Sequence, residues 1–267
     1  MSELVRSLSL YDVIFSGYGY TVGADIFALI PYIVKTGKHF TWIAFVIGGF
    51  IVLATALSYA RLNLEYPSND AEYTWIREAF KVPEEDVKDE ADRRRNKWVD
   101  IFATVVIWAV MIMGVTMNSV MVVSINRFLK KYNINIPDIV LNFLIVLVPF
   151  AVNLLDVKNL SRSNIIVTIL TSIILFSVPA FALKSAPHAK DIELNKLNFS
   201  SDNMVNLIKA IGITILPYNG YQSVVQMSEE VEDTDDVPKG MMISGVLTIA
   251  VYCLLSVSVI AILGLSK

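Results

Sequence analysis

An aspartate stands just behind three glycines in the apolar segment of residues 12–27. Gly17, Gly19 and Gly23 interrupt this segment, and Asp25 follows the last of them. Glycine interruptions free backbone polar groups, which persist at membrane depth only beside a protein-lined cavity. A carboxylate in such a segment is costly in hydrocarbon and by default indicates a functional site. The pattern predicts part of a transporter-like binding site, although glycines at four-residue spacing also serve helix packing.

A second interrupted segment covers residues 211–223. It contains Gly212, Pro217, Asn219 and Gly220 within an otherwise apolar stretch. Proline lacks a backbone donor and clashes with the preceding turn, so this run is hard to explain by helix packing alone. The sequence therefore predicts a second broken helix.

The composition is that of a membrane protein. Over 267 residues, 55% are hydrophobic, 18% are charged and the mean hydropathy is +0.57, whereas a soluble domain carries about 25% charged residues. Apolar runs of about 18 residues or more can span the hydrocarbon core. We expect an all-α polytopic membrane protein, a single membrane domain over residues 1–267. About seven transmembrane helices are predicted, at residues 9–34, 40–64, 98–126, 137–156, 163–184, 204–228 and 238–264.

The two interruptions fall in the first and the sixth of these spans. Transporters with two inverted repeats break the first helix of each repeat around a shared midplane site. This spacing predicts a five-plus-five inverted-repeat fold, in which residues 1–184 form the first repeat and residues 204–264 begin the second. Basic side chains gather in the loop of residues 65–97, so the positive-inside tendency predicts that this loop and the N-terminus are cytoplasmic.

Several classes of function are disfavoured. The net charge of −3 and the lack of a basic face with interleaved aromatics argue against nucleic-acid binding. Cys253 is alone, and His39 and His188 lack companions at metal-ligand spacing, so we expect no metal site. No nucleophile, base and acid stand together, so the sequence predicts neither an enzyme nor a cofactor. The expected partners are a small-molecule substrate and the lipid bilayer.

Four motifs, in order along the chain, resemble the amino acid, polyamine and organocation permeases. Residues 22–27, VGADIF, are similar to the IGSGIF signature of that family's first helix. Residues 56–62, ALSYARL, resemble its second-helix region together with residues 66–68, YPS, and 72–73, EY, which follow them. Residues 153–158, NLLDVK, resemble the end of its fourth helix. Residues 217–221, PYNGY, and 228–231, SEEV, resemble its sixth helix and the following loop. The likeness runs through essentially the whole chain.

This resemblance implies a LeuT-like transporter with a cytoplasmic N-terminus that moves amino acids or related amines, often coupled to protons or by exchange. In such proteins the unwound first helix presents backbone donors to a substrate carboxylate, and carbonyl groups of the sixth helix meet the amine. Carried onto this chain, the predicted substrate-binding residues are Gly19, Gly23, Ala24, Asp25, Tyr218, Asn219, Gly220 and Tyr221.

Asp25 departs from the family pattern because it occupies the place of the second signature glycine. A carboxylate there repels a substrate carboxylate and attracts a cation. We therefore expect an amine, a polyamine or a cationic amino acid as the substrate. The alternatives are that Asp25 pairs with a basic partner and is structural, or that it lies in a water-filled vestibule.

The length is the largest departure. The family fold needs about ten core helices, and the predicted spans stop at the seventh. We expect a C-terminally truncated form, or an oligomer or partner chain that supplies the missing helices. The alternative functions are a non-transporting or ancillary membrane protein and, less favoured, a seven-helix receptor. The receptor is disfavoured by the broken sixth helix and by the N-inside charge bias.

Overall fold

The computed structural model describes residues 6–23, 25–134, 136–154, 157–192 and 197–265. This part of the chain is almost entirely helical, and its one extended pairing is an isolated parallel bridge between Leu8 and Val231. The expected all-α architecture is confirmed. The α-helices are α1 (Leu10–Thr21), α2 (Asp25–Gly37), α3 (Thr41–Glu65), α4 (Ala71–Phe80), α5 (Glu90–Lys131), α6 (Asp138–Asn153), α7 (Val157–Lys184), α8 (Ser201–Thr214) and α9 (Asp236–Leu263).

Both predicted breaks are present. The first span is divided into α1 and α2, which are separated by residues 22–24. The sixth span is α8 followed by two 3₁₀ segments, η5 (Leu216–Tyr218) and η6 (Tyr221–Glu230). Gly220 lies between those segments at φ 125°, a conformation that glycine adopts without the steric penalty of a side chain.

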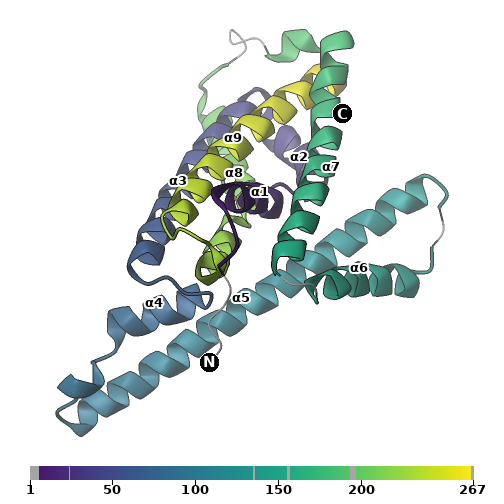
Figure 1. Ribbon diagram of the computed structural model, residues 1–267. Coiled ribbons are helices and arrows are strands. Elements are labelled where there is room, and N and C mark those ends of the chain that lie inside the picture. The colour runs from purple at the N-terminus through teal and green to yellow at the C-terminus, as the bar shows by residue number, and fades with distance from the viewer. Residues whose placement is uncertain (1–5, 24, 135, 155–156, 193–196, 266–267) are drawn as a thin grey trace.

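The core of the molecule is a bundle centred on α9 (Figure 1). α9 packs against α3, α1 and α7, and α8 packs against α3 and α2. Small residues allow the close approach, since a Cβ atom at Gly17 of α1 would stand 2.7 Å from Ser244 Oγ of α9. Close packing of this kind is a main source of helix association in lipid, where burying apolar surface gives little advantage.

α5 and α6 lie largely outside this bundle. In Figure 1 the long α5 runs diagonally below it, with α6 near the later half of α5. The main contacts of α5 are with α4, beside its first turns, and with α6. Large apolar side chains on these two helices are exposed, among them Trp108, Ile112, Phe143 and Val146.

Within the described residues, four helices are long and apolar enough to cross a membrane: Ile26–Glu65, Glu90–Thr116, Asn159–Ala182 and Asp236–Leu263. Seven spans were predicted. The difference arises because the first and sixth spans are broken, α6 is short, and Ile26–Glu65 joins α2 and α3 in one continuous run. α1 and α8 stop after 12 and 14 residues, which is too short to span a bilayer alone. α6, with 16 residues, is a shorter apolar helix.

The segment of residues 65–97, predicted as a loop, contains α4 and the first turns of α5. α5 begins eight residues before the predicted span, because the Asp89 side chain caps it by accepting a bond from the Asp92 amide at 2.9 Å. Arg77 and Lys81 of α4 pair with Asp100 of α5 at 3.0 and 2.9 Å. These contacts hold α4 and α5 together as a helical hairpin.

The N-terminal segment ties the first span to the sixth at the α4 end of the bundle. The amides of Ser7 and Leu8 donate to the Glu230 carbonyl at 2.9 and 3.1 Å, and the Glu232 amide donates to the Leu8 carbonyl at 2.9 Å. The Leu8 side chain is fully buried in a cluster that includes Val224 of η6 and Trp75 of α4. α1 and η6 are thus joined at this end by main-chain bonds.

Candidate substrate site

The end of α1 is shaped by local hydrogen bonds. The Val22 amide donates to the Tyr18 carbonyl at 2.7 Å, and the Gly23 amide turns back to the Thr21 carbonyl at 3.1 Å. The Thr21 hydroxyl donates to the Gly17 carbonyl at 2.8 Å. Such side-chain bonds to the helix backbone compete with continued helix, and the flexible glycine behind them completes the turn.

The sixth break begins at Pro217, which lies in the first turn of η5. Proline is tolerated there because its missing amide would have no helical partner. The amides of Tyr218 and Asn219 close short turns on the carbonyls of Ile215 and Leu216, at 3.2 and 3.1 Å.

The two breaks meet inside the bundle. A Cβ atom at Gly220 would overlap the main-chain carbonyl of Tyr20, near the end of α1. The hydroxyl of Tyr252, on α9, lies 2.9 Å from the Thr21 carbonyl oxygen and 2.9 Å from the Pro217 carbonyl oxygen. Carbonyl groups of both breaks therefore face one buried point.

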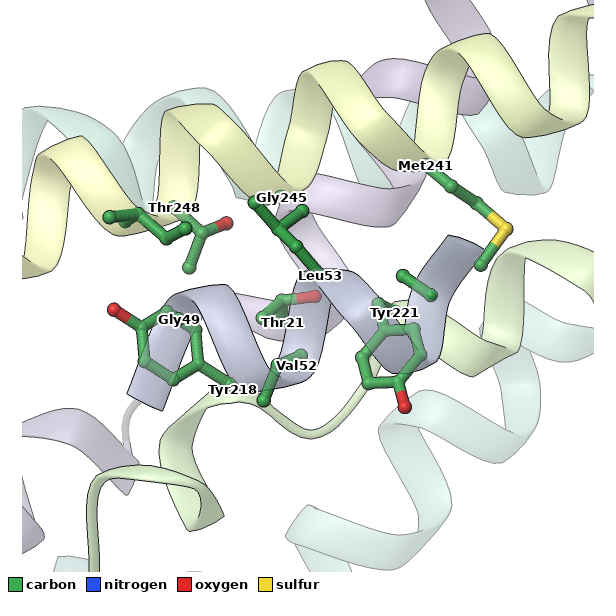
Figure 2. Close-up of a pocket in the computed structure, with 11 residues that line it drawn as sticks. Thr21, Gly49, Val52, Leu53, Tyr218, Tyr221, Met241, Gly245 and Thr248 are labelled. Carbon is green, nitrogen blue, oxygen red and sulfur yellow. The ribbon is translucent and has the colours of Figure 1, made fainter. Parts of the chain in front are cut away.

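A small apolar pocket lies beside this meeting point (Figure 2). Its internal volume is about 10 Å³, roughly the room of one water molecule. In this conformation the pocket is thus closed to an amino acid. α3, α9 and the two breaks line it through Thr21, Gly49, Val52, Leu53, Ala56, Tyr218, Tyr221, Met241, Gly245, Thr248 and Ile249.

The two predicted tyrosines of the sixth break lie on the α3 side. The Tyr218 side chain is 2% exposed, and its hydroxyl donates to the Phe45 carbonyl of α3 at 2.8 Å. The Tyr221 ring meets the Tyr59 ring edge-on, with 5.9 Å between centroids, and the Tyr59 hydroxyl lies 3.4 Å from Glu72 Oε1 of α4. Both tyrosines therefore connect the break to α3 and, through it, to α4.

Gly19, another predicted binding residue, lines a different pocket. A Cβ atom there would overlap the Thr168 hydroxyl of α7, so Gly19 permits α1 and α7 to approach closely. The pocket, of about 50 Å³, lies between these two helices and includes Ser16, Tyr20 and Asn164. The Asn164 amide donates to the Tyr20 hydroxyl at 3.0 Å. Gly19 thus faces α7, on a different side of α1 from Tyr218 and Tyr221.

The remaining predicted residues cluster at the two breaks. Gly23 forms the turn after α1, and Asn219 and Gly220 form the turn between η5 and η6. Asp25 is the first residue of α2, while its side chain and the whole of Ala24 lie outside the described residues. A carboxylate in the first turn of a helix interacts favourably with the helix dipole.

Sequence reasoning missed the polar stripe on α9. Ser244, Thr248, Tyr252 and Ser256 are spaced by four, and all four are buried. Residues four apart lie on one helix face, so this spacing within an apolar span was a signal that the seventh helix contributes polar groups. Among them, Tyr252 forms hydrogen bonds to both breaks.

The site offers hydrogen-bonding groups rather than groups for covalent chemistry. Its acceptors at the meeting point are main-chain carbonyls, and a cationic amine is a natural donor to them. Among the described residues, no cluster of three or more histidine, cysteine, aspartate or glutamate side chains could hold a metal ion.

The chain is similar in sequence to known membrane transport proteins. The family model described as amino acid permease matches residues 8–267. An uncharacterized transporter of Mycobacterium tuberculosis is 23% identical over 269 aligned positions, which cover 98% of this chain and 54% of that protein. The inner membrane transport protein YbaT of Escherichia coli is 41% identical over 64 residues, covering 24% of this chain and 15% of YbaT. The chain thus spans about half the length of the mycobacterial relative.

Proposed function

The chain belongs to the amino acid permease family, and from that premise we propose that it takes part in secondary transport of an amine, a polyamine or a cationic amino acid. The observation that carries this proposal is the meeting of the two breaks around the carbonyls of Thr21 and Pro217. A substrate ammonium carries several N–H donors and a positive charge, and both suit a site of buried carbonyl oxygens. Coupling to protons and exchange are both compatible with this site.

Asp25 supports a cationic substrate through its place in the fold. α2 begins at Asp25, and a helix N-terminus is where a substrate carboxylate is ordinarily held. A negatively charged residue at this position of the chain disfavours a second anion and favours a cation. The competing role is a structural one, in which Asp25 only stabilises the start of α2.

Family membership also bears on the wider arrangement. It argues against the seven-helix receptor and makes the chain an integral membrane protein. We further propose a cytoplasmic N-terminus and loop 65–97, a first repeat of residues 1–184 and a second beginning at residues 204–264. The exposed apolar faces of α5 and α6 suit contact with lipid, and we propose that an oligomer or a partner chain supplies the further helices of the family fold.

The experiment is equilibrium binding of radiolabelled putrescine, arginine and leucine to the purified chain, followed by uptake into liposomes. We expect putrescine or arginine to bind more tightly than leucine. Asp25→Asn should weaken binding of the cationic compounds by about tenfold, because it removes one favourable charge interaction with the substrate.

Asp12→Asn is the matched control. Asp12 lies in the same broken span, where it accepts bonds from Ser161 of α7 at 2.6 Å and from Ser9 at 2.7 Å. Its replacement should lower stability without changing the preference for cations. Unchanged putrescine affinity in Asp25→Asn would overturn the role of Asp25, and absence of binding for all three compounds would favour the non-transporting alternative.

A further inference from the structure

The Tyr252 side chain of α9 is hydrogen-bonded to both breaks. It is fully buried, and its ring lies 5.8 Å from the Phe45 ring and 5.2 Å from the Tyr218 ring. Its hydroxyl oxygen lies 2.9 Å from the carbonyl oxygens of both Thr21 and Pro217. The surrounding rings thus fix the hydroxyl where segments from opposite ends of the sequence meet.

The chemistry of this contact is that of one donor shared by two acceptors. A tyrosine hydroxyl carries a single proton, so it serves two carbonyls by a three-centre bond or in alternation. Both carbonyls belong to interrupted helices, and buried carbonyls without a partner are costly. Moving either break away from α9 therefore removes a hydrogen bond from a buried carbonyl, which is costly.

We propose that Tyr252 is a positioning residue that holds the two breaks together as one cooperative unit. α9 carries the hydroxyl, so a displacement of α9 is transmitted to the end of α1 and to η5 at once. This contact is separate from the main-chain bridge of Leu8 with the sixth span at the α4 end of the bundle. The Tyr252 hydrogen bonds and the Leu8 bridge thus join the first and sixth spans at two different places in the bundle. The proposal concerns the protein's own geometry and does not depend on the class of substrate.

Hydrogen exchange of the unmodified protein gives the first test. Val22, Gly23, Asn219 and Gly220 each donate a backbone hydrogen bond, so their amides report on the two breaks. If Tyr252 joins the breaks, all four amides should open together and show similar protection in residue-resolved exchange of the purified chain. Independent opening, with clearly different protection at the two breaks, would overturn the proposal without any variant being made.

Tyr252→Phe gives the second test because it removes only the hydroxyl. We expect exchange to become about threefold to tenfold faster at both breaks, which is the effect of losing one net hydrogen bond. Tyr218→Phe is the matched control, since that hydroxyl binds the Phe45 carbonyl of α3. With Tyr252 in place it should accelerate exchange at all four amides alike, because the two breaks open as one unit. In the Tyr252→Phe background the same change should accelerate exchange at Asn219 and Gly220 only.

The pattern of exchange separates positioning from packing. Faster exchange along the whole of α3 and α9 in Tyr252→Phe would assign the residue a general packing role and overturn the proposal. Unchanged exchange at both breaks would do the same. Acceleration confined to the two breaks, with the midpoint of thermal unfolding lowered only slightly, supports it.

Discussion

The bundle centred on α9 and the pair formed by α5 and α6 are both strongly apolar, yet only the bundle is closely packed. A Cβ atom at Gly17 in the bundle would meet Ser244 at 2.7 Å, whereas one at Gly114 of α5 would have no heavy atom within 4 Å. The large side chains of α5 point outward, with Trp108 61% exposed. Apolar composition therefore places both regions in the membrane, and small residues with polar contacts decide which helices associate.

The largest expected contrast is between Gly220 and Gly114. Gly220→Ala places a side chain at φ 125° and against the Tyr20 carbonyl, so we expect a loss of about 2–5 kcal/mol in the free energy of unfolding. Gly114→Ala meets open space within a helix and should be neutral or stabilising by up to about 1 kcal/mol. Thermal unfolding in detergent measures both, and equal effects would contradict the distinction between the two regions.

A second contrast lies within the bundle. Gly17→Ala would crowd Ser244 Oγ at 2.7 Å and Val224 Cγ2 at 2.8 Å, which should cost about 1–3 kcal/mol through overpacking. Gly212→Ala in α8 has no neighbour within 4 Å and should stabilise the helix by about 0.5–1 kcal/mol. Chemical denaturation in mixed micelles gives the two values, whose opposite signs are the expected result.

Tryptophan fluorescence distinguishes lipid-facing from buried surfaces. In single-tryptophan variants that keep Trp108 or Trp75, we expect brominated lipids to quench Trp108 strongly and Trp75 weakly. Trp108 is 61% exposed on α5, and Trp75 is 7% exposed, with its indole N–H donating to the Tyr66 carbonyl at 2.9 Å. Weak quenching of Trp108 would show instead that another helix covers this face of α5.

The smallest expected effect concerns Glu230, beside the N-terminal bridge. Burial, and then the charge of Glu229, raises the pKa of Glu230 above its ordinary value of 4.5. The ionised form is therefore disfavoured in the folded state, and stability should rise as the pH falls from neutral through the raised pKa. Glu230→Gln should lack this rise, while Glu232→Gln, at an exposed position, should retain it. Thermal midpoints measured over a pH series test this, and identical profiles for both variants would contradict it.

The sequence predicted the helices and the breaks well because both depend on local chemistry. The apolar runs gave the seven segments, and the glycines and Pro217 gave the two interruptions, which the structure places at the ends of α1 and α8. The start of α5 was placed too late because Asp89 and its charged neighbours cap a helix that extends beyond the apolar run. The roles of the predicted substrate-binding residues stay predictions.

Contacts between distant segments could not be predicted in the same way. Nothing local distinguishes Tyr252 from a lipid-facing tyrosine, and only its spacing with Ser244, Thr248 and Ser256 indicated a polar face on α9. Gly19 is a case in which a local pattern was present but had two interpretations. Its spacing with Gly23 was compatible with binding or with packing, and its approach to Thr168 of α7 depends on how the bundle assembles.

The bridge between Leu8 and Val231 has a consequence for biosynthesis. Leu8 is made well before its main-chain partners Glu230 and Glu232, which lie far later in the sequence. Until then α1 lacks its contacts with η6 and α9, and it is too short to be stable in the bilayer alone. The first span therefore gains these contacts only after the sixth span has been made. During this interval in translation the chain is most open to chaperones and proteases.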